Sequence, residues 1–209
     1  AVEINTSFYR PHQQSTYRRW AAAVPDAFAF AVKAPKTITH QLRLADAGPV
    51  LDAFLAQVSG LGAKLGPLLF QLPPSLAFDE ASVQSFLRVL RERFDGSVVW
   101  EPRHLGWFTG SADDLLKGFR IARAAVDPAI VDAAAKPGGW RGLTYFRLHG
   151  SPRVYYSAYG PERLERFAQQ LLKARDEQSA VWCIFDNTAS GAATTDAFAL
   201  QALVRSNLP

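Results

Sequence analysis

Cysteine is almost absent from this sequence, and methionine is missing altogether. The single cysteine, Cys183, cannot form an intramolecular disulfide, so we expect a protein of the reducing cytoplasm. The chain opens on Ala-Val-Glu-Ile-Asn, with no initiator methionine and no secretion signal. We therefore expect that part of the natural N-terminus is missing from the sequence.

Long apolar runs are also lacking. The longest, such as 28–32 and 66–70, are far shorter than the roughly 20 residues that span a bilayer, and we predict no membrane partner. No glycine-rich phosphate turn follows any early strand. This lack weighs against a Rossmann-like dinucleotide fold.

What is present has the composition of a folded globular protein, with 48% hydrophobic and 20% charged residues. We expect a single domain over residues 1–209. The net charge of +4 mildly favours anionic partners. The densest basic cluster, Arg88, Arg91 and Arg93, has helical spacing, which predicts a solvated helix face and leaves nucleic-acid contact as an alternative.

Strand-like and helix-like segments alternate along the chain. Apolar, β-rich runs occur at 2–8, 28–33, 67–72, 98–101, 121–127, 143–149 and 181–186. Helical spacing links Leu51, Phe54, Leu55 and Val58, then Val83, Phe86, Leu87 and Leu90, and then Leu164, Phe167, Leu171 and Leu172. Asp79 and Pro161 are expected helix starts, 194–204 a final helix, and 136–139 a loop. This alternation predicts an α/β fold, a TIM-like (β/α) barrel whose N-terminal strand is missing from the chain.

Polar residues recur where the predicted strands end. In a barrel all carboxyl ends of the strands meet at one rim, so distant residues would converge there. Alternation places Tyr145, Arg147 and His149 on one face of their strand, with Phe146 and Leu148 on the face toward the helices. The alternative is that these charges only neutralise one another in buried ion pairs, for example Glu101 with Arg147.

An enzyme acting on an anionic or polyhydroxylated small molecule is the first functional hypothesis, with hydrolysis as the reaction class. The catalytic candidates are Glu101, Asp186 and His149. The substrate-binding candidates are Glu3, Asn5, Lys33, Gln71, Arg103, His104, Arg147 and Asn187. Four aromatic residues follow strand ends and have two interpretations: they stack on a ring of the substrate, or they pack their own loops. They are Trp107, Tyr155, Tyr156 and Tyr159.

Three other functional interpretations remain open. Metal-assisted hydrolysis would use Glu3, Glu101, His104, His149 and Asp186, but no short ligand spacing supports it, so we assign no metal ligand and identify no cofactor. A Schiff base at Lys33 would need a depressed pKa. A non-catalytic module would bind nucleic acid or a phosphate ligand through the basic residues.

Seven ordered motifs resemble a known family: Val-Glu-Ile-Asn-Thr-Ser-Phe-Tyr at 2–9, Phe-Ala-Val-Lys-Ala-Pro at 30–35, Ile-Thr-His at 38–40, Leu-Phe-Gln-Leu-Pro-Pro at 69–74, Trp-Glu-Pro-Arg-His at 100–104, Tyr-Phe-Arg-Leu-His-Gly at 145–150 and Phe-Asp-Asn-Thr at 185–188. The chain is similar to the YecE-like family, also called domain of unknown function 72. The resemblance implies a TIM barrel, with a further strand before residues 2–5, and it carries no activity to transfer.

Overall fold

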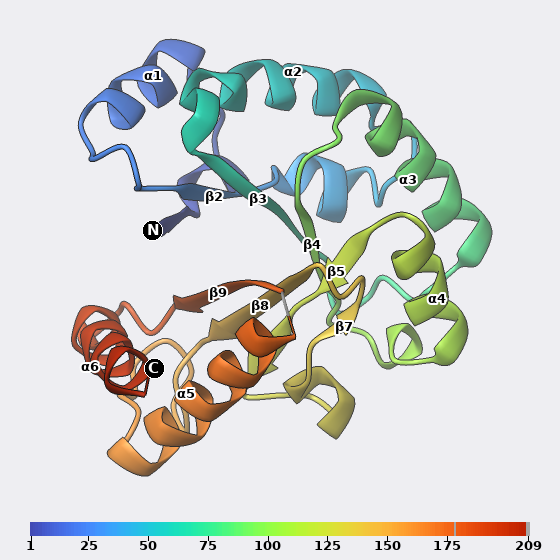
Figure 1. Cartoon of the computed structure of the whole chain (residues 1–209). Helices are drawn as coiled ribbons and strands as arrows, with labels where there is room; N and C mark the ends of the chain where they lie inside the picture. The colour runs from blue at the N-terminus through green and yellow to red at the C-terminus, as the bar shows by residue number, and fades with distance from the viewer. Residues whose placement is uncertain (178, 208–209) are drawn as a thin grey trace. The chain divides into compact units, whose positions relative to one another are not determined.

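The computed structural model describes residues 1–177 and 179–207. By its internal contacts the chain divides into two compact units, Ala1–Ile121 (unit 1) and Ala122–Pro209 (unit 2). Within each unit, strands alternate with helices along the chain (Figure 1).

Unit 1 contains four parallel strands in the order β1-β2-β3-β4. They are β1 (Val2–Ile4), β2 (Phe30–Lys33), β3 (Leu65–Gln71) and β4 (Val98–Glu101). The register places Glu3 opposite Ala31, Lys33 opposite Leu69 and Gln71 opposite Glu101. Because all four strands run in one direction, their carboxyl ends lie along one edge of the sheet.

The helices of unit 1 are α1 (Gln14–Ala22), α2 (Gly48–Val58), α3 (Glu80–Arg93) and α4 (Gly110–Gly118). The predicted periodicities are confirmed, because α2 buries Leu51, Phe54 and Val58 and α3 buries Val83, Phe86, Leu87 and Leu90. These side chains share one core cluster with Phe30, Val32, Leu68 and Phe70 of the strands. Asp79 caps α3 as predicted, since its carboxylate accepts a hydrogen bond from the Ser82 N–H at 2.9 Å.

The predicted basic face of α3 is only partly solvated. Arg88 and Arg93 are exposed, as predicted, but Arg91 is half-buried. Its guanidinium donates to four backbone carbonyl oxygens, those of Phe94, Gly96, Phe119 and Arg120, at 2.8–3.1 Å. The prediction was therefore wrong for Arg91, which ties the end of α3 to the segment after α4.

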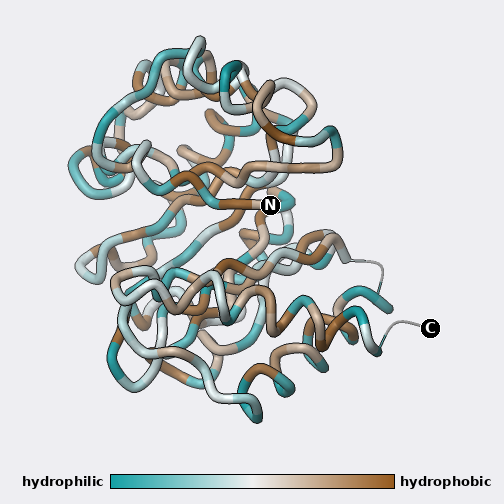
Figure 2. The backbone as a smooth tube through the Cα atoms, turned by 90° about the vertical axis from the view of Figure 1, so that its left-hand side faces the viewer, coloured by the Kyte–Doolittle hydropathy of each residue, from teal (hydrophilic) through white to brown (hydrophobic). Residues whose placement is uncertain are grey.

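Unit 2 contains a parallel three-stranded sheet in the order β6-β8-β9. Its strands are β6 (Ala125–Asp127), β8 (Leu143–Leu148) and β9 (Ala180–Phe185). The helices are α5 (Pro161–Asp176), which has Pro161 at its start as predicted, and α6 (Ala192–Ser206). Phe146 and Leu148 join Leu164 and Leu171 in one core cluster, which confirms the predicted outward face of β8. Figure 2 shows that hydrophobic and hydrophilic residues alternate along the helical coils of the backbone.

Several predicted boundaries were wrong. The expected strand at 2–8 ends at Ile4, because Thr6–Phe8 forms a 3-10 turn. The expected strand at 121–127 is two strands, β5 (Ile121–Arg123) and β6. The predicted loop at 136–139 contains β7 (Gly138–Gly139), which pairs antiparallel with β5. The Arg123 side chain accounts for this pairing, since it donates to the Ala133 carbonyl at 2.9 Å and lies where any side chain on Gly138 would have to be.

The mixed α/β class with parallel strands is confirmed, whereas no closed barrel is found among the described strands. None of the helices within residues 1–177 and 179–207 has both the length and the apolar character needed to cross a bilayer.

Candidate functional site

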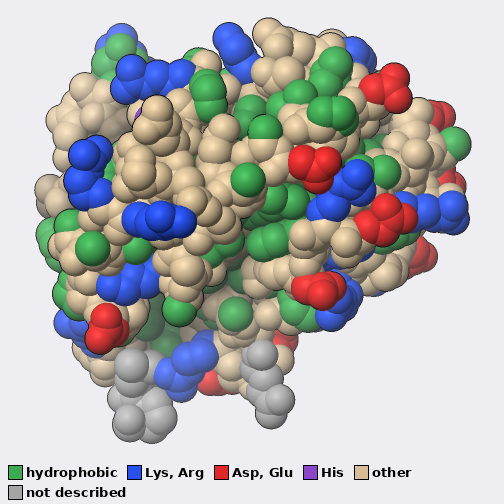
Figure 3. Space-filling model, turned by 90° about the horizontal axis from the view of Figure 1, so that it is seen from above, with side chains coloured by type: hydrophobic (Ala, Val, Ile, Leu, Met, Phe, Trp, Pro, Cys, Tyr) green, Lys and Arg blue, Asp and Glu red, His purple; other side chains and the backbone are tan. Residues whose placement is uncertain are grey.

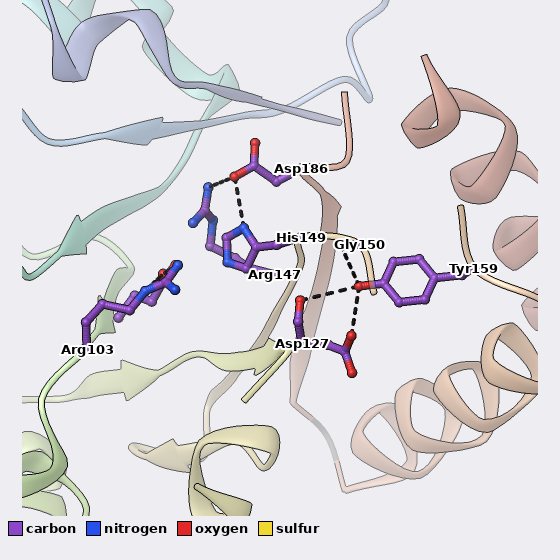
Figure 4. A network of polar contacts seen from close by, with 8 residues as sticks. Arg103, Asp127, Arg147, His149, Gly150, Tyr159 and Asp186 are labelled. Carbon is purple, nitrogen blue, oxygen red and sulfur yellow. Dashed lines mark hydrogen bonds and ion pairs between the residues drawn. The ribbon is translucent and has the colours of Figure 1, made fainter. Parts of the chain in front are cut away.

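The main polar cluster of unit 2 joins the end of β8 to the residue that follows β9. The parallel register sets Leu148 opposite Phe185, so Asp186 comes next to His149. The Asp186 N–H donates to the Leu148 carbonyl at 2.8 Å, and this bond holds the backbone of Asp186 beside the end of β8. As Figure 4 shows, Arg147 and His149 both point to one oxygen of Asp186. Arg147 Nη2 lies 3.0 Å and His149 Nδ1 3.1 Å from Asp186 Oδ2.

Burial makes this arrangement electrostatically demanding. Arg147 is fully buried, His149 is only 2% exposed, and the Asp186 side chain retains 17% exposure. A buried guanidinium needs a counter-charge, which Asp186 supplies. Because a carboxylate can only accept hydrogen bonds, the pair with Asp186 favours the His149 tautomer that carries its proton on Nδ1. The basic lone pair of that tautomer is on Nε2.

Behind this cluster, Tyr159 ties the start of the following loop to β6. Its hydroxyl accepts a hydrogen bond from the Gly150 N–H at 2.8 Å and donates to Asp127 Oδ1 at 3.0 Å (Figure 4). Arg163 of α5 pairs with the other oxygen of Asp127. Burial raises the pKa of Tyr159, so this phenol keeps its proton at neutral pH. Tyr159 therefore packs the loop, which is the second of the two interpretations that the sequence allowed.

Asn187, a predicted substrate-binding residue, is fully buried. Its Nδ2 donates to Asp196 Oδ2 at 2.7 Å and to the Ser157 carbonyl at 3.0 Å. Asp196 also accepts from the Tyr159 N–H at 3.1 Å. The sequence analysis missed Asp196, although its place on the buried face of α6 with Ala193 and Leu200 was a usable signal. These contacts hold the loop after β8 to the loop after β9.

In unit 1 the predicted residues follow the ends of four strands. Glu101 is fully buried, and Arg103 pairs with it, Nε lying 2.7 Å from Oε1. Lys33 is 8% exposed, with Nζ 4.3 Å from the centre of the Phe8 ring. Burial lowers the pKa of His40, and the positive charges of Lys33 and Lys36 lower it further. Lys33 and Lys36 thus lie close enough to act on His40, a proximity that the sequence analysis did not identify.

The other predicted residues of unit 1 are distributed as follows. Glu3 is buried, and Asn5, Gln71 and His104 are half-buried. His104 Nδ1 accepts a hydrogen bond from the Gly106 N–H at 3.0 Å and so caps the short turn Leu105–Trp107. Trp107 is fully buried, and its indole N–H donates to the Leu76 carbonyl at 2.8 Å. Trp107 therefore packs its loop and offers no stacking surface.

The structure thus brings Arg147, His149 and Asp186 together in unit 2. Among the described residues there is no group of three or more histidine, cysteine, aspartate or glutamate side chains arranged to hold a metal ion. Ion pairs do form at strand ends, Arg147 with Asp186 and Arg103 with Glu101, whereas the pair given as the example, Glu101 with Arg147, stays a prediction.

These features define a class: a mixed α/β protein with parallel strands and ionised side chains at their carboxyl ends. Residues 1–208 match the family described as "Protein of unknown function DUF72", and the chain belongs to this family. This agrees with the resemblance seen in the motifs.

Named relatives are similar to the chain over different lengths. The UPF0759 protein YecE of Escherichia coli (strain K12) is 29% identical over 141 residues, which cover 65% of this chain and 51% of YecE. The match therefore spans about half the length of YecE. The UPF0759 protein YunF of Bacillus subtilis (strain 168) is 23% identical over 220 residues, covering 91% of this chain and 78% of YunF.

Two solved structures share the fold. A DUF72 family protein from Enterococcus faecalis aligns with a TM-score of 0.82 at 20% identity, covering 100% of this chain and 86% of that protein. A DUF72 family protein from Thermotoga maritima aligns with a TM-score of 0.76 at 22% identity, covering 98% and 82%. At these identities the likeness concerns the fold alone.

Proposed function

We propose that the chain is a hydrolase-type enzyme that acts on an anionic or polyhydroxylated small molecule, with His149 as its general base. One observation carries the proposal: His149 Nδ1 lies 3.1 Å from Asp186 Oδ2, at the carboxyl ends of two neighbouring parallel strands. An imidazole oriented by a carboxylate in this way is a recurrent arrangement for proton abstraction.

In the proposed reaction His149 Nε2 accepts a proton from a water molecule as the water oxygen attacks the electrophilic centre of the substrate. The bond to the leaving group breaks, and the imidazolium returns the proton to that group. Asp186 stabilises the imidazolium while it exists, and Arg147 orients the Asp186 carboxylate through the contact at 3.0 Å. The exposed part of the Asp186 side chain is the point where solvent reaches this cluster.

The remaining predicted residues complete the proposal. Glu101 is a second acid/base candidate, and Arg103 lies against it. Glu3, Asn5, Lys33, Gln71, His104 and Asn187 stay predictions for the substrate side. The proposal also includes a single domain over 1–209, closure of the strands into a TIM-like barrel and a cytoplasmic location. The alternation of parallel strands with helices supports the barrel.

Substitution of His149 and Asp186 tests this mechanism. The wild-type chain, His149→Gln and Asp186→Asn are assayed against phosphomonoesters and glycosides. Each substitution is expected to lower turnover about 10²- to 10⁴-fold, the usual contribution of general-base catalysis. Glu165→Gln, an exposed change on α5, is the matched control, and circular dichroism checks folding.

Full turnover by His149→Gln on an identified substrate would contradict the assignment, and hydrolysis of no compound in the panel would exclude these substrate classes. The non-catalytic alternative makes a different prediction. Binding of nucleic acid or phosphate would then persist in His149→Gln and weaken steeply with salt.

A further inference from the structure

We propose that residues 153–156, which follow β8, form the recognition element for a phosphorylated ring compound: Tyr155 and Tyr156 contact the ring, and Arg153 binds the phosphate. This inference rests on the proposed function, because it concerns the substrate of the His149 site. It also replaces Arg147 as the anion-binding residue of unit 2. We call residues 153–156 the aromatic arm.

The backbone of the aromatic arm is held from both sides. The Tyr155 N–H donates to the His149 carbonyl at 2.5 Å, and the Tyr155 carbonyl accepts from the Ala189 N–H at 3.0 Å. The Ser190 hydroxyl donates to the Tyr156 carbonyl at 2.5 Å. These bonds join the arm to the strand end that carries His149 and to the loop after Asp186. The arm is therefore pinned beside the proposed base.

A close approach at Gly150 reinforces this position. Gly150 has φ of +89°, and a Cβ there would lie 2.8 Å from the Ser157 carbonyl oxygen. Only glycine fits a turn that is both left-handed and this close to another backbone segment. The turn folds the chain back directly after His149, so the arm starts at the site.

Although its backbone is pinned, the arm leaves large side chains in solvent. Tyr155 is 47% and Tyr156 45% exposed. Tyr155 has φ of +69°, a conformation that costs a non-glycine residue about 1–3 kcal/mol. Its ring is edge-on to the His149 imidazole, with centroids 5.9 Å apart. The Tyr155 ring is exposed, lies beside the proposed base and is held there although its backbone conformation is unfavourable. It is therefore well suited to contact the apolar face of a substrate ring.

Arg153 supplies the positive charge. Its guanidinium carbon lies over the Tyr156 ring, 3.9 Å from the ring centre, in a cation–π contact that holds the guanidinium beside the ring. Across residues 1–177 and 179–207, no carboxylate forms an ion pair with Arg153, whereas Arg147 is neutralised by Asp186. A stacked guanidinium keeps its N–H groups in its own plane, where they can hold a phosphate through two parallel hydrogen bonds.

The ligand chemistry that fits these groups is a ring with a phosphate attached. A hexose phosphate and a nucleoside monophosphate both have it, so calorimetric titration compares glucose 6-phosphate and adenosine 5′-monophosphate with glucose, adenosine and inorganic phosphate. We expect at least one phosphorylated ring to bind, and its two separate parts to bind at least tenfold more weakly. Arg153→Gln should remove the preference for the phosphorylated form, and Tyr156→Ala should weaken the phosphorylated and the parent ring alike.

Two control variants come from the same unit. Phe198→Ala removes a 68% exposed aromatic side chain from α6, and Arg166→Gln removes an exposed arginine from α5; neither should change affinity. Tyr155→Phe should keep the affinity that Tyr155→Ala loses, because the ring and not the hydroxyl makes the contact.

Binding of neither phosphorylated ring would overturn the inference, as would unchanged affinity in Arg153→Gln and Tyr156→Ala. The His149→Gln variant separates this result from the proposed function. If that variant keeps both affinity and turnover, the base assignment is wrong while the aromatic arm stands. If the variants of the arm bind normally and His149→Gln loses turnover, the arm is wrong while the base stands.

Discussion

The two units place ionised side chains at strand ends in different ways. In unit 1 the buried Glu101 is paired with Arg103, two residues further along the same segment. In unit 2 Asp186 is paired with Arg147, 39 residues away and on a different strand. The first pair is formed by local backbone geometry, whereas the second exists only when β8 and β9 lie side by side. The strand-end ion pair of unit 2 therefore depends on tertiary structure, whereas the strand-end ion pair of unit 1 does not.

The largest effect should come from the cores, which test whether the two units unfold together. Leu68→Ala in unit 1 and Leu148→Ala in unit 2 each delete a fully buried side chain and should cost about 2–5 kcal/mol of unfolding free energy. If residues 1–209 form one domain, both changes lower the same denaturant midpoint, measured by tryptophan fluorescence and by circular dichroism. A separate transition that only Leu148→Ala shifts would contradict the single domain.

A smaller loss of unfolding free energy should distinguish a carboxylate with long-range partners from one with a local partner. Asp196→Ala in unit 2 leaves the Tyr159 N–H and the Asn187 amide without their buried acceptor, and should cost about 3 kcal/mol. Asp79→Ala in unit 1 removes an exposed helix cap, worth about 1 kcal/mol. Chemical unfolding of both variants measures the difference. Equal losses would show that the buried network of unit 2 is no more valuable than a surface cap.

The smallest effect concerns pH and belongs to unit 1. Burial raises the pKa of Tyr17 from 10 to about 12. Because the folded-state pKa is the higher one, the stabilisation is complete below pH 10 and is lost as the pH rises toward 12. Between pH 8 and pH 11 the free energy of unfolding of Tyr17→Phe should therefore fall by about 1 kcal/mol less than that of the wild type. Parallel curves for the two proteins would refute this.

The sequence predicted helices well where an apolar stripe faces a sheet. In α3, Val83, Phe86, Leu87 and Leu90 repeat at helical spacing because they all meet the core. The sequence analysis missed α1, where Tyr17 is buried while Trp20 and Ala21 are only partly buried against the core, because these three residues form no clear apolar periodicity. It also missed β7, because two glycines carry no side-chain pattern and their pairing is determined by Arg123.

For the candidate site, the rule that polar residues end parallel strands found Arg147, His149 and Asp186. The same rule could not find Asp196 or distinguish Tyr155 from Tyr159. The roles of these residues depend on hydrogen bonds between distant parts of the chain, such as the bond from the Tyr159 N–H to Asp196, 37 positions away. A local pattern contains no information on such contacts.

The position of Arg91 changes how the charge of this protein should be interpreted. The 23 basic and 19 acidic residues give a net charge of +4, but the Arg91 guanidinium faces four carbonyl oxygens of its own chain. Part of the positive charge is thus directed inward, and on the face drawn in Figure 3 the Lys and Arg side chains are spread out, with Asp and Glu among them. Retention on a cation exchanger should accordingly be weaker than the formal charge suggests.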